Sequence, residues 1–175
     1  MPFAIERARE LGFDLATMVE ASMVPCKQEL RDLCDPQVCE HYGTCWSCPP
    51  GAGSFEQCAA TIAAKSKGVL VQSVREGVDF NDVELLDQIR AKHNLRLDRL
   101  AHDLRQLHGE VLEFTTGGCN LCDSCLYPDE PCALPERRRL ALSAHGVDVE
   151  ELCQRAGMEY AFENGTIRFI GLILY

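Results

Sequence analysis

The sequence lacks the motifs that mark several large functional classes. It contains no P-loop, no GxGxxG turn and no nucleophile elbow, so it gives no sign of nucleotide-binding, Rossmann or hydrolase chemistry. It also lacks any run of about 20 apolar residues, and its N-terminus has no basic region followed by an apolar block. From these absences we expect a soluble, cytoplasmic protein that does not associate with membranes.

Positive charge is also scarce. Lysine and arginine total 17 against 27 aspartate and glutamate residues, which gives a formal net charge of -10. A chain with this charge repels phosphate backbones and anionic lipid surfaces at long range. The composition therefore disfavours nucleic acid as a partner.

Cysteine, in contrast, is abundant. The chain has 175 residues, 46% of them hydrophobic, which is enough for one good-sized core and predicts one domain over residues 1–175. It holds 11 cysteines. Because the cytosol keeps thiols reduced, this usage disfavours a disulfide framework and favours metal ligation or redox chemistry.

Periodicity and turn residues predict an α/β (α+β) fold, in which helices cover a small mixed sheet. Apolar residues at helical spacing, with capping residues, predict helices over 3–22, 55–66, about 82–108, 135–144 and 148–156. Runs rich in β-branched residues predict strands over 69–74, 158–163 and 166–174, with 111–116 as a strand or the end of a helix. The pair Asn164-Gly165 predicts a C-terminal β-hairpin between the last two strands.

Four cysteines follow one another closely in the stretch GGCNLCDSCLYPDEPC. They are Cys119, Cys122, Cys125 and Cys132. Two-residue gaps let successive thiolates face one centre, and a more distant fourth thiolate can close the site. Zinc sites more often use two separated CxxC pairs, so the spacing favours an iron–sulfur cluster over structural zinc and over simple packing.

A second group of thiols occurs earlier, in a loop that has no helical or strand periodicity. Its candidate ligands are Cys34, Cys39, Cys45 and Cys48, and the last of them is followed by two prolines. Cys26 and Cys58 are near enough in sequence to replace Cys45 as the fourth ligand, whereas Cys153 on a late helix is most simply a core residue. The two loops together predict two metal-binding sites.

The motifs resemble a known family. The string CEHYGTCWSCPP is similar to the signature Cys-x-x-Tyr-Gly-x-x-Trp-x-Cys-Pro-Pro of the predicted metal-binding proteins catalogued as domain of unknown function 2284, and the second cysteine string resembles that family's second motif. The resemblance implies metal ligation by Cys39 and Cys48, with Cys34 upstream, and by the four later cysteines. Cys45 stands at a variable position of the signature, and Ala133 stands where the family usually has a basic residue.

Three functional hypotheses follow. The first is a protein with two [4Fe–4S] clusters that transfers electrons to a redox partner protein, because complete thiolate ligation suits outer-sphere electron transfer. The second is a redox enzyme or activating factor, in which an incompletely ligated iron of the first cluster binds substrate. The third is an interaction module stabilised by zinc.

Other residues near the motifs or on the long helix have simpler interpretations. Trp46, between two candidate ligands, is expected to shield a cluster from water. The arginines at 137–139 could balance an anionic cluster, although a solvated charged face is the simpler interpretation. The histidines His93, His102 and His108 are expected on the outer face of the long helix rather than as ligands.

Overall fold

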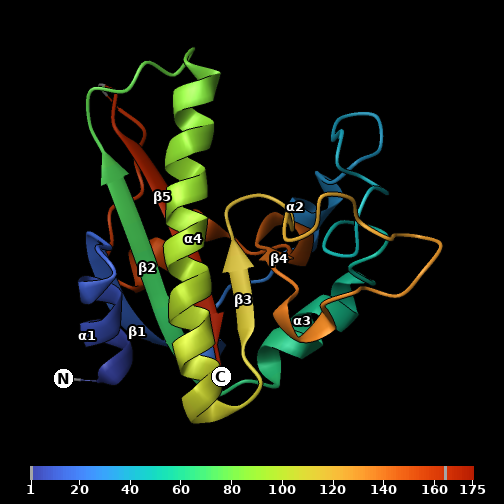
Figure 1. Cartoon of the computed structure of the whole chain (residues 1–175), viewed down its shortest axis with the longest axis horizontal. Coiled ribbons are helices and arrows are strands. Elements are labelled where there is room, and N and C mark those ends of the chain that lie inside the picture. The colour runs from blue at the N-terminus through green and yellow to red at the C-terminus, as the bar shows by residue number, and fades with distance from the viewer. Residues whose placement is uncertain (1, 164) are drawn as a thin grey trace.

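The computed structural model describes residues 2–163 and 165–175, and it contains an open, mixed five-stranded sheet with helices on both faces (Figure 1). The strands are β1 (Leu15–Glu20), β2 (Lys67–Arg75), β3 (Leu112–Thr115), β4 (Leu140–Ala141) and β5 (Ile167–Leu174). Their order in the sheet is β1-β2-β5-β3-β4, in which only the β3–β4 pair is parallel. The α+β fold class predicted from the sequence is confirmed.

Among the described residues, five α-helices and three short 3-10 helices complete the fold. The α-helices are α1 (Phe3–Glu10), α2 (Gln28–Asp32), α3 (Phe55–Ala63), α4 (Val83–His108) and α5 (Val149–Arg155). The 3-10 helices are η1 (Ala21–Met23), η2 (Pro135–Arg137) and η3 (Ser143–His145). No helix in the described part of the chain is both long and apolar enough to cross a membrane.

The sheet is buried on both faces, which explains why its central strands are almost continuously apolar. In β2, Val69 and Val71 pack under α1 and α4, while Leu70 between them packs into the opposite cluster with α3 and α5. On the α4 side, β5 contributes Gly171, where an added Cβ would lie 2.7 Å from both methyl carbons of Leu97. The missing side chain therefore lets α4 approach the sheet closely.

Several helix boundaries agree with the sequence. Ser54 and Gln57 form the predicted capping box at the start of α3, and Asp82 caps α4 through the backbone N–H of Leu85. Asp148 caps α5 in the same way through Glu151. Each of these caps joins two residues only three positions apart, so the local sequence is enough to predict it.

Other expectations about the elements are wrong. The helix predicted over 3–22 ends at Glu10, because Gly12 adopts φ of +84° and the chain continues as β1, paired antiparallel with β2. The helix predicted over 135–144 is replaced by η2, β4 and η3.

The predicted C-terminal hairpin also changes. Residues 158–163 form no strand, and Asn164 of the predicted turn lies outside the described residues. The last strand, β5, instead pairs with β2 and β3, which occupy its two edges.

The histidines of α4 divide between its two faces. His102 and His108 are exposed as expected, but the prediction for His93 is wrong, because its ring is only 1% exposed. Its Nδ1 lies 2.9 Å from the hydroxyl of Ser73 on β2. Burial lowers the pKa of His93 to about 4, so this ring is neutral at neutral pH.

Candidate metal centre

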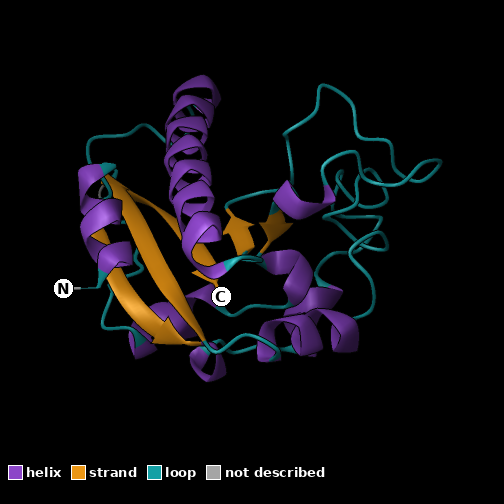
Figure 2. Ribbon diagram, turned by 60° about the horizontal axis from the view of Figure 1, so that its bottom comes forward, coloured by secondary structure: helices purple, strands orange, loops and turns teal. Residues whose placement is uncertain are grey.

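The two cysteine-rich segments are loops that leave the sheet and lie side by side at one end of the molecule (Figures 1 and 2). The first runs from α2 to the capped start of α3, and the second runs from the end of β3 to η2. Neither loop contains a helix or strand in the described structure. Their positions therefore depend on the elements that flank them and on the contacts between them.

Aromatic residues hold the two loops together. The indole N–H of Trp46 donates to the carbonyl of Glu130 at 3.0 Å, and its ring meets Tyr127 edge to face at 4.9 Å between centroids. Gly51 lies against the same tyrosine, since an added Cβ would come within 2.8 Å of its ring. Trp46 is half-buried, in keeping with its expected place beside the thiols.

Ser47 makes the closest polar link between the loops. Its side chain is fully buried, and its hydroxyl oxygen accepts the backbone N–H of Cys119 at 2.9 Å. The same oxygen lies 3.3 Å from the sulfur of Cys45. Gly118 adds to this contact, because a Cβ at that residue would lie 3.5 Å from the sulfur of Cys48 and 4.0 Å from that of Cys45.

The two loops enclose one pocket of about 310 Å³ that is lined by six thiol-bearing residues. These residues are Cys45, Cys48, Cys119, Cys122, Cys125 and Cys132. The pocket thus gathers all four candidate ligands of the later motif and two of the four from the earlier one. Cysteines far apart in sequence share a single cavity rather than two separate ones.

The other two candidates of the first motif lie to one side. Cys34 lines a separate depression with Arg31 and Tyr42. Burial raises the pKa of the Cys34 thiol, and the nearby Cys39 thiol adds to that shift while Arg31 opposes it. Cys39 also contributes to the raised pKa of Cys48, so it lies within electrostatic reach of the pocket.

The three remaining cysteines are less suited to ligation. Cys153 is fully buried in the apolar cluster under the sheet, and burial raises its pKa to about 11, so its prediction as a core residue is confirmed. The thiol of Cys58 is buried and donates to the carbonyl of Ala52 at 3.4 Å. The thiol of Cys26 is half-buried beside the carbonyl of Val24.

The thiols of Cys45 and Cys48 interact with each other. The interaction with Cys48 lowers the pKa of Cys45 to about 5, and the same interaction raises the pKa of Cys48. Thiolates are the form that binds metals, and the lowered pKa of Cys45 favours that form. Metal binding would release the remaining thiol protons.

The donor chemistry of the pocket fits a metal or iron–sulfur centre. Among the described residues, no group of three or more histidine, cysteine or carboxylate side chains is arranged so that it could already hold a metal ion. The pocket nevertheless places six soft sulfur donors around one cavity, on loops without regular hydrogen bonding. Soft thiolates select zinc, copper(I) and iron–sulfur clusters over harder cations.

A cation without an acidic partner also lines this pocket. Within the described structure, Arg138 lies within ion-pair distance of no carboxylate, and its Nε is buried without a hydrogen-bond partner. Arg138 lines the pocket together with the six cysteines. Of the three consecutive arginines, this one is suited to balance an anionic centre.

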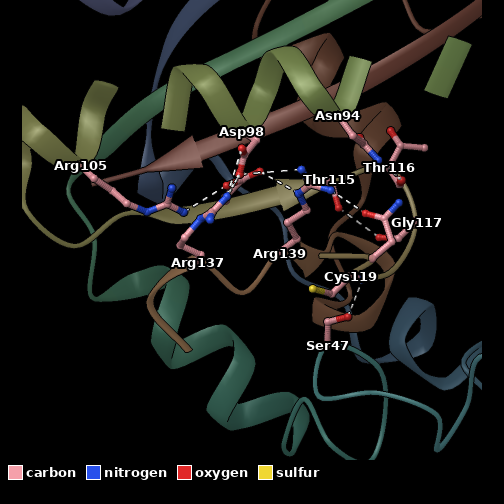
Figure 3. A network of polar contacts seen from close by, with 12 residues as sticks. Ser47, Asn94, Asp98, Arg105, Thr115, Thr116, Gly117, Cys119, Arg137 and Arg139 are labelled. Atoms are coloured by element: carbon pink, nitrogen blue, oxygen red, sulfur yellow. Dashed lines mark hydrogen bonds and ion pairs between the residues drawn. The ribbon is translucent and has the colours of Figure 1, made fainter. Parts of the chain in front are cut away.

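The two neighbouring arginines have a different role, which Figure 3 shows. Arg139 is 7% exposed, and its guanidinium lies 3.4 Å from the carboxylate of Glu113 on β3. It donates to the side-chain oxygen of Asn120, between two cysteines of the second loop, at 2.6 Å. Arg137 and Arg139 both approach Asp98 of α4. The network ties the second cysteine loop to the sheet and to α4.

Glu113 is the buried anion of this network. Its side chain is fully buried, and Arg105 of α4 lies 3.1 Å from its carboxylate. Burial raises the pKa of Glu113, and the two arginines oppose this shift. In the sequence, the position of Glu113 between Leu112 and Phe114 of a strand is the signal that indicates a buried cationic partner.

Asn94 provides an unused acceptor in the wall of the pocket. Its side-chain N–H donates to the carbonyl of Thr116 at 3.2 Å, which fixes the orientation of the amide. Its oxygen is buried without a hydrogen-bond partner, although the residue is only 4% exposed. Since Asn94 lines the thiol pocket, a ligand there could supply the missing donor.

A family model described as "Predicted metal-binding protein (DUF2284)" matches residues 17–175, which include both cysteine loops and the whole sheet except two residues of β1. The chain belongs to the DUF2284 family. The resemblance inferred from the two motifs is thereby confirmed. The family description supports metal binding by this cysteine-rich chain and names no particular metal. No curated protein and no solved structure matches the chain.

Proposed function

We propose that this DUF2284 protein binds two [4Fe–4S] clusters and transfers electrons to a redox partner protein. The observation that carries the proposal is the pocket lined by six cysteines from both motifs. A single structural zinc site needs only four ligands, so six thiols around one cavity exceed what one such ion uses. When bound, a cluster of this kind would supply a reversible one-electron redox centre.

The charges around the pocket support the same proposal. Thiolate-bound clusters are anionic, and the half-buried Arg138 offers a positive charge within ion-pair distance of no carboxylate in the described structure. Trp46 lines the pocket and is held in place by its contacts with Tyr127 and Glu130. Burial and local charge are two of the factors that set a cluster's potential.

All eleven cysteines are free thiols in the structure, which is consistent with a reducing compartment. We therefore place the protein in the cytoplasm. Its redox partner would be a protein rather than a nucleic acid or membrane surface, in view of the net charge of -10.

Anaerobic purification with assays of iron, acid-labile sulfide and zinc tests this function. We expect about eight iron and eight sulfide per chain, a brown colour and a reversible change in visible absorption on reduction. The Cys122→Ala variant should lose iron, whereas Cys153→Ala, which alters only a core thiol, should retain the wild-type amount. Zinc without sulfide in a colourless, redox-inert protein would instead support the zinc-stabilised interaction module.

Asn94 favours a second candidate function, in which an incompletely ligated iron of the first cluster binds a substrate. Its buried oxygen has no partner and needs a donor such as an N–H, an O–H or a bound water. Paramagnetic resonance of the reduced protein, recorded with and without added small hydroxy acids, whose hydroxyl group supplies an O–H donor, separates the candidates. A carrier with complete thiolate ligation should give identical spectra, whereas an open iron should give a changed spectrum that Asn94→Leu weakens.

A further inference from the structure

We infer that Cys45 and Cys48 of the first motif and Cys119 of the second bind the same metal centre, so that the two motifs share a site. This inference rests on the metal-binding part of the proposed function and does not depend on which metal is bound. It differs from the ligand sets expected from sequence, in which each motif holds its own centre. Under the new assignment Cys119 joins Cys45 and Cys48 in the first centre, and Cys122, Cys125 and Cys132 remain for the second, so the fourth ligand of each centre comes from outside the six pocket cysteines.

The first argument is the close approach of the backbone. Gly118 faces the sulfur atoms of Cys45 and Cys48, at 4.0 and 3.5 Å from where its Cβ would stand. These are ordinary van der Waals distances, so the backbone that leads into Cys119 lies beside both sulfurs, and all three cysteines line the same pocket.

The second argument is the hydrogen bonding of Ser47, which lies between the two first-motif thiols. Its oxygen accepts the N–H of Cys119, so the single hydroxyl proton remains free to point elsewhere. When Cys45 is a thiolate, its sulfur has no proton to donate. The hydroxyl of Ser47 is then the only possible donor across the 3.3 Å between the two atoms. One buried hydroxyl thus fixes the backbone of Cys119 and donates to the sulfur of Cys45.

The third argument is the different environment of Cys34. It lines a depression apart from the thiol pocket, beside Arg31. The loop contacts of Trp46 with Glu130 and of Gly51 with Tyr127 hold the pocket side of the first motif against the second motif. Cys119 is therefore better placed than Cys34 to complete a centre with Cys45 and Cys48.

Metal content of matched cysteine variants tests the shared centre. We expect Cys48→Ala and Cys119→Ala each to lose the same half of the bound metal and the same spectral signal, and the double variant to lose no more than either single variant. Cys34→Ala and Cys153→Ala should keep the wild-type amount. Circular dichroism melting curves would show that each variant retains the folded core.

Ser47→Ala provides a second measurement that does not remove a ligand. Because hydrogen bonds to sulfur favour the reduced and more negative state, losing this donor should shift the midpoint potential to more negative values while metal content stays the same. Ser124→Ala, an exposed serine in the second loop, is the control and should leave the potential unchanged.

The outcomes separate this inference from the proposed function. If Cys48→Ala and Cys119→Ala lose different halves, and the double variant loses all the metal, the sharing is wrong while iron–sulfur binding stands. If the wild type holds zinc without sulfide, the iron–sulfur proposal is wrong, and equal zinc loss in the two single variants still supports sharing. A wild-type protein that holds no metal after anaerobic purification overturns both.

Discussion

At the scale of single residues, burial decides what the polar side chains near the thiols can do. The buried Ser47 accepts the N–H of Cys119, and the buried Asn94 donates to the carbonyl of Thr116. Residue type and spacing identify the six thiols of the pocket, but they do not reveal these contacts. His93 has polar sequence neighbours, yet its ring lies against Phe13 and beside Ser73 of the sheet.

The burial of His93 predicts acid-sensitive stability. Its folded-state pKa of about 4 lies below the ordinary value of 6.5, so between these values the unfolded chain binds more protons than the folded one. The free energy of unfolding should therefore fall as the pH decreases through this window, with His93 contributing about 2 kcal/mol of the loss between about pH 7 and pH 5.

Urea denaturation at both pH values measures this contribution. His93→Gln should lose less stability on acidification than the wild type, whereas His102→Gln, an exposed histidine on the same helix, should match the wild type. An equal pH dependence in wild type and His93→Gln would show that the ring is not kept neutral by the fold.

At the scale of elements, helices with their own caps were predictable, whereas elements defined by distant partners were not. α3 and α4 each begin at a capping residue whose side chain accepts the backbone N–H of the residue three positions later. The helical spacing of 3–22 does not reveal β1, because its ladder with β2 joins residues about fifty positions apart. Similarly, β4 has only two residues, and its partner β3 lies on the other side of the second cysteine loop in the sequence. No local sequence pattern therefore marks this strand.

Arg139 predicts how firmly the second cysteine loop is held to these elements. Removing its buried guanidinium leaves Glu113 with Arg105 alone and frees Asn120, so Arg139→Met should cost about 3–5 kcal/mol of unfolding free energy. Arg137→Met removes an arginine that is 47% exposed and shares the partner Asp98, and it should cost less than about 1 kcal/mol.

Urea unfolding of the two variants measures the difference. If Arg139→Met does not fold, the double variant Glu113→Leu with Arg139→Met should recover part of the lost stability, because it removes the buried anion that Arg139 neutralises, while Arg105 loses its partner. Equal costs for the two arginines, or no recovery in the double variant, would show that the buried pair does not anchor the loop.

At the scale of the whole molecule, the sheet and the metal-binding loops depend on different interactions. The two apolar clusters around the sheet include none of the six pocket cysteines, so the core is complete without a metal. The loops contain no helix or strand in the described structure and would be ordered by their mutual contacts and by the bound centre. The sequence predicts two metal-binding sites from two separate motifs, and only the tertiary structure shows that the two loops line one pocket.

Metal removal should therefore loosen one end of the molecule and leave the rest folded. In the protein freed of metal by oxidation and chelation, amide hydrogen exchange should accelerate in residues 34–53 and 117–134, because these segments lack the ladders that protect a backbone. Exchange in β2 and β5 should stay slow, since each pairs along most of its length with neighbouring strands and is buried on both faces. Hydrogen-exchange mass spectrometry of the metal-loaded and metal-free protein measures both regions in one experiment. The double variant Cys48→Ala with Cys119→Ala, left untreated, should show faster exchange around its altered residues without the chemical treatment and so serves as the control. Equal acceleration in β2 and β5 would mean that the centre is required for the core itself to fold.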